Sequence, residues 1–216
     1  MFSKYILCVI YIDNHLSYED VYIYPSDSTP YGQSYSEWSI RWWKWALSIP
    51  KKTNPTFDLT GAYAHIDQNE KDVFYLCQTF ERLPIVPIRK ITIPFGKAVF
   101  MPIINWISVI PQDGINENQL VATAKRKIDA VENLKVLLNY KELNIDYSIY
   151  RIRSATFKAY LPNDNILNVN DGYCICLSDG YWLLFKSLKR HLVLSTYGSC
   201  SLGVTKITIN YTLDYQ

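Results

Sequence analysis

Acidic and basic side chains that could share a hydrolytic site are spread over the whole chain. Glu37, Asp171 and Asp179 are candidate acid or base groups, and Arg41 or Arg151 could stabilise negative charge beside them. Hydrolysis would require two or more of these groups to meet in one cleft with perturbed pKa values. Because the spacing alone does not bring them together, a hydrolase is one hypothesis, and no residue is assigned a catalytic role.

Potential metal ligands are few and scattered. The histidines His15, His65 and His191 are isolated from one another and from acidic neighbours, so each is expected to be a surface or satisfied core residue. Cys174 and Cys176 lie two residues apart on one face of an expected strand and could share a soft metal. No matching Cys or His pair lies near them, which favours two small buried side chains. We therefore predict no metal site.

Motifs that bind cofactors are absent from the sequence. It contains no Gly-rich phosphate loop and no HExxH, GxSxG or CxxC pattern, so no cofactor is predicted. A formal net charge of +2 with dispersed lysines and arginines does not favour a nucleic-acid partner. The chain has 6 Trp and 18 Tyr, whose rings can stack on sugars or serve as amphipathic strand residues. This aromatic content is the best indication of binding.

Residues 34–50 are predicted to form a helix that is buried on several sides. Ser34 and Glu37 form a capping-box pattern, and Pro50 ends the segment. Four of the 6 tryptophans fall within it, and its apolar side chains occupy most of the helical circumference. We expect this helix to anchor a core.

The polar stripe of this helix, defined as Glu37, Arg41, Lys44 and Ser48, is what remains to contact a ligand. The i,i+4 pair of Glu37 and Arg41 would support an exposed helix, whereas on a buried helix it would line a pocket for an anion or a sugar hydroxyl. The predicted ligand-binding residues are Glu37, Arg41, Lys44, His65, Arg151, Arg153 and Trp182.

The rest of the chain is predicted to be mainly β. Residues 116–133 read as an amphipathic surface helix with one buried stripe that includes Val131. Residues 207–215 alternate strictly between apolar and polar side chains, as antiparallel strands do. Further strands are expected at 72–80, 91–93, 98–104, 136–140, 150–160, 173–177, 181–185 and 191–195. The fold class is a single α+β domain over 1–216: an antiparallel β-sandwich with a Trp-rich buried helix and one amphipathic surface helix.

The N-terminal run 5–12 is apolar and rich in β-branched and aromatic residues. It is either a strand or an uncleaved targeting segment, and the lack of a small-x-small cleavage site favours the strand. No stretch approaches the roughly 18 apolar residues of a membrane span. These features favour an intracellular location.

Several motifs in order resemble an uncharacterised family of mostly secreted bacterial and archaeal proteins. The opening signature is Tyr31–Pro50, and the resemblance spans about residues 31–213. The other matching pieces are Asn54-Pro55, Asp58-x-Thr60-Gly61, Val73–Leu76, Ile93–Lys97, Phe100-x-Pro102, Asn105, Tyr150–Ser154 and Asp179–Trp182. The resemblance implies a fold and a family but no activity.

The chain departs from this family at two positions and at its N-terminus. Members carry cysteines where this chain has Ala64 and Ile91, and they carry a signal peptide that is not evident here. The joint loss of both members of a plausible bridge fits a reducing compartment, or a protein that is stable without the bridge.

The leading functional prediction is a non-catalytic module that binds a carbohydrate or a small polar ligand through exposed Trp and Tyr side chains. The alternatives are the hydrolase described above and a structural or assembly subunit whose surface tyrosines contact other chains. Ligand, oligomeric state and physiological partner are not determined by the sequence.

Overall fold

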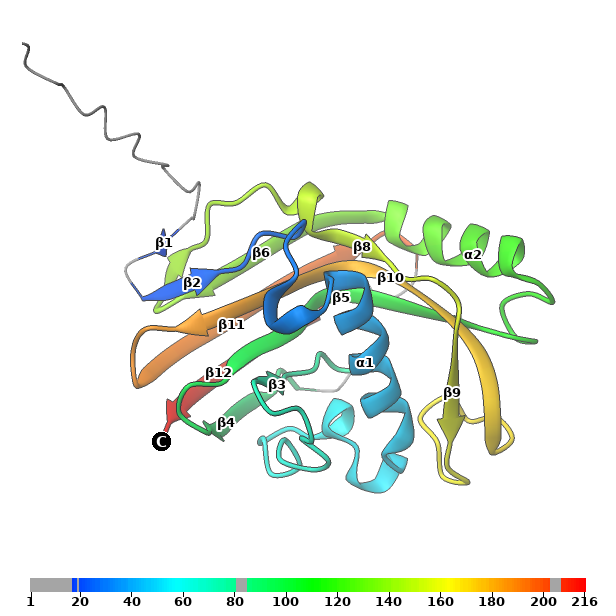
Figure 1. Ribbon diagram of the computed structural model, residues 1–216, viewed down its shortest axis with the longest axis horizontal. Coiled ribbons are helices and arrows are strands. Elements are labelled where there is room, and N and C mark those ends of the chain that lie inside the picture. Colours follow the sequence, from blue (N-terminus) through cyan, green and yellow to red (C-terminus); the bar gives the residue numbers. More distant parts are fainter. Residues whose placement is uncertain (1–16, 19, 81–84, 203–206) are drawn as a thin grey trace, which may run out of the picture.

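The computed structural model describes residues 17–18, 20–80, 85–202 and 207–216. The predicted strand at 5–12, together with Cys8 and His15, lies outside these residues. Within them, two β-sheets pack around a shared hydrophobic core, and a Trp-rich helix is buried against that core (Figure 1). The predicted mainly β class is therefore confirmed.

The first sheet has seven strands in the order β1-β2-β10-β5-β3, with β8 and β9 also paired to β10. Its pairs are antiparallel except for β3 with β5, which is parallel. The strands are β1 (Ser17–Tyr18), β2 (Val21–Ile23), β3 (Val73–Tyr75), β5 (Ala98–Val109), β8 (Arg151–Arg153), β9 (Phe157–Leu161) and β10 (Gly172–Ser187). β5 is almost entirely buried, which explains its near-continuous apolar sequence.

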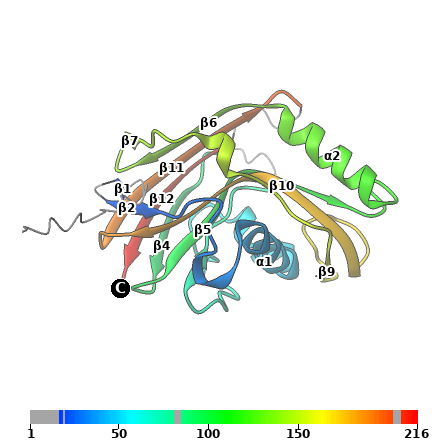
Figure 2. The ribbon, with the colours of Figure 1, turned by 45° about the horizontal axis from the view of Figure 1, so that its top comes forward.

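The second sheet has five strands in the order β4-β12-β11-β6-β7. They are β4 (Ile88–Ile93), β6 (Val131–Leu138), β7 (Lys141–Glu142), β11 (His191–Cys200) and β12 (Ile207–Tyr215). In β12 the buried residues from Ile209 to Tyr215 alternate with half-buried ones, which confirms the predicted alternation. Figure 2 shows this sheet as a separate layer beside β5 and β10.

The Trp-rich helix α1 (Tyr35–Ser48) begins with the predicted capping box, since Ser34 and Glu37 exchange hydrogen bonds. Its four indoles are at most 6% exposed. Each indole N–H nevertheless donates a hydrogen bond, at 2.7–3.0 Å, to a different segment of the protein. The acceptors are the carbonyl of Pro30 for Trp38, the carbonyl of Leu76 for Trp42, Ser178 Oγ for Trp43 and the carbonyl of Ile66 for Trp45.

The C-terminal end of α1 is held by Asn54, which is completely buried. Its amide nitrogen donates to the carbonyls of Ala46 and Ile49 at 2.7 and 2.9 Å. Its amide oxygen accepts from the backbone N–H and the hydroxyl of Thr56. One side chain thus satisfies helix-end carbonyls and orders the chain that follows, which passes through the short 3-10 turns Lys51–Thr53 and Pro55–Phe57.

The second helix, α2 (Glu117–Asp129), is shorter than predicted. Its buried residues Leu120 and Ala124 pack on Leu177 of β10, so the predicted amphipathic surface helix is present. Val131, which was expected on its apolar stripe, instead begins β6 and pairs with Cys200 of β11. Pairing across the sheet has overridden the helical period at this end.

Several strand predictions were also wrong in their boundaries. Of the strand predicted at 72–80, only Val73–Tyr75 (β3) forms. The segment predicted as one strand at 150–160 is divided into β8 and β9, and a 3-10 turn at Tyr147–Tyr150 precedes it. Conversely, 173–177 and 181–185 belong to one continuous strand, β10. Gly180 lies inside that strand at a point where a side chain would not fit, because a Cβ there would lie 2.6 Å from Asn105 Cβ on β5. The remaining 3-10 turn is Pro30–Gly32.

Replacing the buried amide of Asn54 with a carboxylate should be strongly destabilising. Asn54→Asp removes two donors and places an anion against two carbonyl oxygens, which we expect to cost about 3 kcal/mol or more. The exposed Asn133→Asp is the matched control and should change stability little. Urea denaturation measures both variants.

The pH dependence of this loss provides a second check. Burial should raise the pKa of the introduced carboxyl above its unfolded value, so it is neutral at low pH and costs less there. The stability difference from the wild type should therefore shrink as pH falls. A loss that is small, or that does not change with pH, would contradict the assigned role of Asn54.

Candidate functional site

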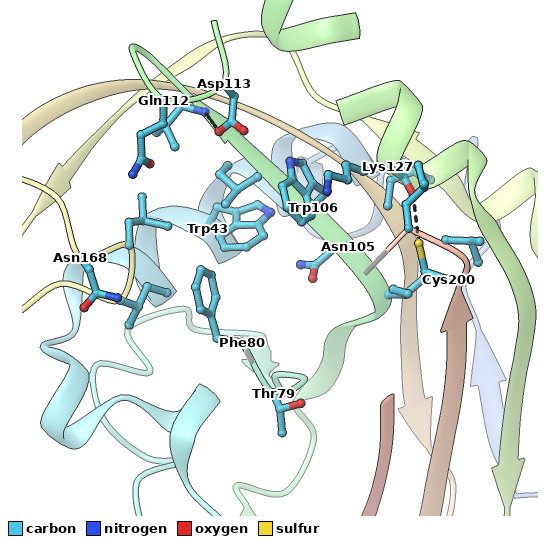
Figure 3. Close-up of a pocket in the computed structure, with 18 residues that line it drawn as sticks. Trp43, Thr79, Phe80, Asn105, Trp106, Gln112, Asp113, Lys127, Asn168 and Cys200 are labelled. Carbon is cyan, nitrogen blue, oxygen red and sulfur yellow. Dashed lines mark hydrogen bonds between the residues drawn. The ribbon is translucent and has the colours of Figure 1, made fainter. Parts of the chain in front are cut away.

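A pocket of about 500 Å³ opens beside the middle of β5 (Figure 3). Its walls come from β5, from Trp43 of α1, from the end of α2 and from the segment 166–168. Cys200 at the end of β11 and Phe80 after β3 complete the lining. Drug-sized and metabolite-sized ligands occupy cavities of about 300–1,000 Å³, so this volume suits a small molecule.

Most of the pocket wall is apolar. Trp43, Ile107, Val109 and Ile166 are each at most 6% exposed and belong to the main core. The ring of Trp43 is fixed because its Nε1 donates to Ser178 Oγ of β10 at 2.9 Å. The wall is therefore a rigid extension of the core rather than a flexible surface cleft.

Asn105 is a polar residue within the apolar sequence of β5. It pairs with Gly180 on β10, whose missing side chain lets the two strands approach at this point. Its amide nitrogen is buried and has no hydrogen-bond partner. In Figure 3 the Asn105 side chain lies between Trp43 and Cys200, within the pocket. A buried donor without a partner costs about 1–3 kcal/mol, so an acceptor placed at this atom would be stabilising.

The α2 side of the pocket carries a cation. Lys127 Nζ lies 4.6 Å from the centre of the Trp106 ring, which is a cation–π contact. Trp106 Nε1 is itself buried without a hydrogen-bond partner. Among the residues that the structure describes, no carboxylate forms an ion pair with Lys127. The pocket thus combines an apolar body with donors and one positive charge.

Asp113, whose carboxylate also lines the pocket, forms hydrogen bonds within the turn that follows β5. Its Oδ2 accepts from the backbone N–H of Val109 at 2.9 Å, and its own N–H donates to the carbonyl of Val109. Thr123 of α2 donates to the Asp113 carbonyl. Asp113 therefore holds the turn in place and is not arranged as a free acid or base.

The predicted polar stripe is on the surface, away from this pocket. Glu37, Arg41 and Lys44 line two shallow hollows of about 250 and 410 Å³ together with Glu70. Arg41 pairs with Glu70 at 2.9 Å rather than with Glu37. Hydrogen bonds from the backbone and hydroxyl of Ser34 lower the pKa of Glu37. Within the polar stripe, Glu37 therefore caps the N-terminus of α1, and Arg41 links the helix to Glu70.

The other predicted ligand-binding residues do not join the stripe. Neither hollow over the stripe is lined by Arg151 or Arg153, and Arg153 is exposed. His65 is exposed, with its ring against Phe74. Trp182 is completely buried and stacks on Phe100 at 5.1 Å between ring centres. Its ring therefore has no face to offer a ligand, which corrects its place among the predicted contacts.

Arg151 instead belongs to a structural ion-pair network. It donates two hydrogen bonds to Asp179, at 3.2 and 2.9 Å, and one to Asp129 at 2.7 Å. These bonds raise the pKa of Arg151 further above its usual range. The network joins β8, β10 and the end of α2, and so fixes the helix that carries Lys127.

The carboxylates of the hydrolase hypothesis are dispersed. Glu37 is bound to Ser34 at the start of α1, and Asp179 is paired with Arg151 inside the sheet. Asp171 is exposed just before β10. The structure does not bring these three groups into one cleft. Among the described residues, no cluster of three or more His, Cys, Asp or Glu side chains could hold a metal ion.

The pocket could not be predicted from the sequence because its residues come from six separate segments. The signal that was available is Asn105, an amide inside the mostly apolar twelve-residue strand β5. A polar side chain in such a run needs either a partner or a ligand. Lys127 gave no signal of its own, because a lysine near the end of an amphipathic helix is ordinary.

Comparison with known proteins adds little to this description. No family model and no curated protein matches the chain. A solved chain from the structure described as PbICP-C in complex with falcipain-2 is similar at 9% identity and a TM-score of 0.27. It aligns with 68% of this chain and 100% of its own length. A likeness this distant carries no argument. No helix among the described residues is long and apolar enough to cross a membrane.

Breaking the ion-pair network should show that it is structural. Asp179 is 2% exposed, so Asp179→Asn leaves the Arg151 guanidinium without its buried partner and should cost about 1–3 kcal/mol. Asp129→Asn removes an exposed partner of the same arginine and should cost less. Urea denaturation of both variants gives the comparison, and equal losses would contradict it.

The contribution of Asp129 to the free energy of unfolding should depend on pH. Hydrogen bonds from Lys125 and Arg151 lower the pKa of Asp129, so its contribution is present above the unfolded pKa and is lost as pH falls. The stability difference between wild type and Asp129→Asn should therefore shrink in acid.

Proposed function

We propose that the protein is a non-catalytic binding module and that its ligand occupies the pocket beside Asn105. The ligand has an apolar body and one acceptor group, most simply a carboxylate. The observation that carries this proposal is the buried amide nitrogen of Asn105, which has no partner inside the protein. An acceptor placed at that atom would restore the missing hydrogen bond.

The charge of the pocket supports an anionic head group. Lys127 brings an ammonium group to the pocket without a carboxylate partner among the described residues. The buried walls of Trp43, Ile107 and Ile166 favour a hydrocarbon body. A sugar would bury several hydroxyl groups against these walls with few partners, which is unfavourable. In place of the small polar ligand expected from the sequence, we therefore propose an amphipathic ligand.

Binding fits the lining better than catalysis does. A primary amide and an ammonium group orient a ligand, whereas Asp113 already serves a turn. Cys200 also lines the pocket, and its thiol donates to the carbonyl of Lys127 at 3.6 Å. Among the described lining residues, no acid–base pair is arranged as catalysis would require.

A second candidate site for carbohydrate lies on the outer face of β9 and β10. Tyr160 and Tyr173 are directly opposite in the register and are 49% and 70% exposed. Their ring centres are 5.4 Å apart, and Lys158 Nζ lies 4.4 Å from the Tyr173 ring. Exposed tyrosines with a nearby polar group are what a glycan-binding surface requires.

Membership of the resembled family is also a proposal. One feature supports it: Ala64 and Ile91, which stand where members carry cysteines, line the same small cavity together with Gly61. Two cysteines at these places would therefore line one cavity, as is needed for a bridge between them.

A ligand panel with pocket variants tests the main proposal. Thermal stability should rise with medium-chain fatty acids and rise less with the corresponding alcohols, because the carboxylate meets Asn105 and Lys127. Saturation at one hundred times Kd corresponds to about 2.7 kcal/mol of stabilisation. Asn105→Leu should reduce the stabilisation by the acid, because the carboxylate loses one of its two donors.

Two tryptophan substitutions in one loop provide the matched control. Leu167→Trp fills the pocket and should abolish the response, whereas Val169→Trp, which does not line the pocket, should keep it. Equal loss in both variants, or no response of the wild type to any acid, would contradict a ligand site in this pocket.

A glycan array tests the second candidate. Binding that is lost in Tyr160→Ala and Tyr173→Ala, and retained in the exposed control Tyr140→Ala, would support a carbohydrate surface on β9 and β10. If the wild type binds no glycan on the array, the proposed carbohydrate surface is contradicted.

A further inference from the structure

Two thiols lie side by side on β10, and neither was assigned a role above. Cys174 Sγ and Cys176 Sγ are 3.3 Å apart, because residues two apart on a strand point to the same face. Cys174 is partly exposed, whereas Cys176 is completely buried. Cys176 lies opposite both Phe157 of β9 and Val109 of β5, so the pair has one accessible and one enclosed sulfur.

The two sulfurs are electronically unequal as well. The hydrogen bond from the Cys176 thiol lowers the pKa of Cys174. That hydrogen bond and burial together raise the pKa of Cys176. The thiolate is the reactive form of cysteine, so the more exposed sulfur is also the better nucleophile.

We propose that Cys174 and Cys176 form a thiol–disulfide exchange site for low-molecular-weight disulfides such as oxidised glutathione. Cys174 is the attacking sulfur and Cys176 is the resolving one. Among the described residues no third ligand accompanies the pair, which favours this two-sulfur chemistry over a closed metal site.

The reaction balances in two steps. The Cys174 thiolate attacks one sulfur of the disulfide RSSR, a bond from Cys174 to SR forms, the S–S bond of RSSR breaks, and RS⁻ leaves. Cys176 then loses its proton and attacks Cys174 Sγ, the bond to SR breaks, and a second RS⁻ leaves. The protein is oxidised by two electrons, and RSSR is reduced to two thiols, which take up the protons released by Cys174 and Cys176.

The strand geometry makes the product easy to reduce. Residues two apart on an extended strand have Cα atoms about 6.6 Å apart, near the upper end of the range that a disulfide spans. A bond between Cys174 and Cys176 would pull on β10 where it is paired on both sides. Strained disulfides are the readily reduced ones, so the site would act reversibly rather than as a permanent bridge.

The other described thiols lack this arrangement. Cys77 is completely enclosed beside Arg89, and burial raises its pKa. Cys200 is partly exposed, and its thiol, like that of Cys174, donates to a backbone carbonyl, but it has no second sulfur beside it. Cys200 is therefore a matched internal control for accessibility.

Peptide mapping after exposure to oxidised glutathione tests the proposal. In a Cys8→Ser background, the wild-type peptide that contains residues 174 and 176 should lose two hydrogen masses, and reduced glutathione should restore them. Cys176→Ser should instead accumulate a mixed disulfide on Cys174, while Cys174→Ser should leave Cys176 unmodified. Cys174 should react faster than Cys200, since the adjacent Cys176 thiol stabilises the Cys174 thiolate.

Three results would overturn the proposal. They are reaction at Cys200 as fast as at Cys174, a wild-type product that remains a mixed disulfide with Cys176 still free, and failure of Cys176→Ser to retain the mixed disulfide. If a variant does not fold, a time course of differential alkylation on the Cys8→Ser protein decides the first two. This test uses no pocket ligand, so its outcome is independent of the proposed binding function.

Discussion

The fold depends on burying four indoles of one short helix without leaving their N–H groups unpaired. An indole brings a large apolar ring into the core, but burying its N–H without an acceptor costs free energy. The four acceptors belong to four different segments: the turn before α1, the turn that contains Ile66, the residue that follows β3, and β10. α1 is consequently fixed in position, rotation and depth, because no shift of the helix could satisfy all four bonds at once. Asn54 closes the far end in the same way, by donating to carbonyls that the helix leaves free.

This constraint also creates the candidate site. Trp43 is held by Ser178 of β10, and two residues further along Gly180 lets β5 come close at Asn105. The same strand therefore positions the apolar wall and the amide donor of the pocket. On the other side, the network of Arg151, Asp179 and Asp129 holds the end of α2, from which Lys127 reaches Trp106. Arg41 and Arg151, which were predicted from the sequence to bind a ligand, thus form ion pairs that hold segments of the fold together.

The features that could be predicted from the sequence are those with a local cause. The capping box at Ser34, the burial of the Trp-rich helix and the alternation along β12 each follow from a short pattern, and each is confirmed. The predictions are wrong where contacts with segments distant in the sequence determine the local structure. Val131 leaves the helical pattern because β11 pairs with it, and β10 passes through Gly180 because β5 requires the space. Trp182 was expected to meet a ligand, but Phe100 and Trp42 enclose it. The pocket could not be assembled from periodicity, since its lining comes from segments that only the tertiary fold brings together.

The proposed ligand site depends most directly on one hydrogen bond, which the buried amide nitrogen of Asn105 would donate to an acceptor on an amphipathic ligand. The most direct measurement is the side-chain amide resonance of Asn105 in an isotope-labelled NMR spectrum, assigned by its loss in Asn105→Leu and followed during titration with a medium-chain fatty acid. The account predicts a saturable downfield shift of that resonance, with the same midpoint as the change at the Trp106 indole N–H. An Asn105 amide signal that stays constant while the acid binds elsewhere, or does not bind at all, would contradict it.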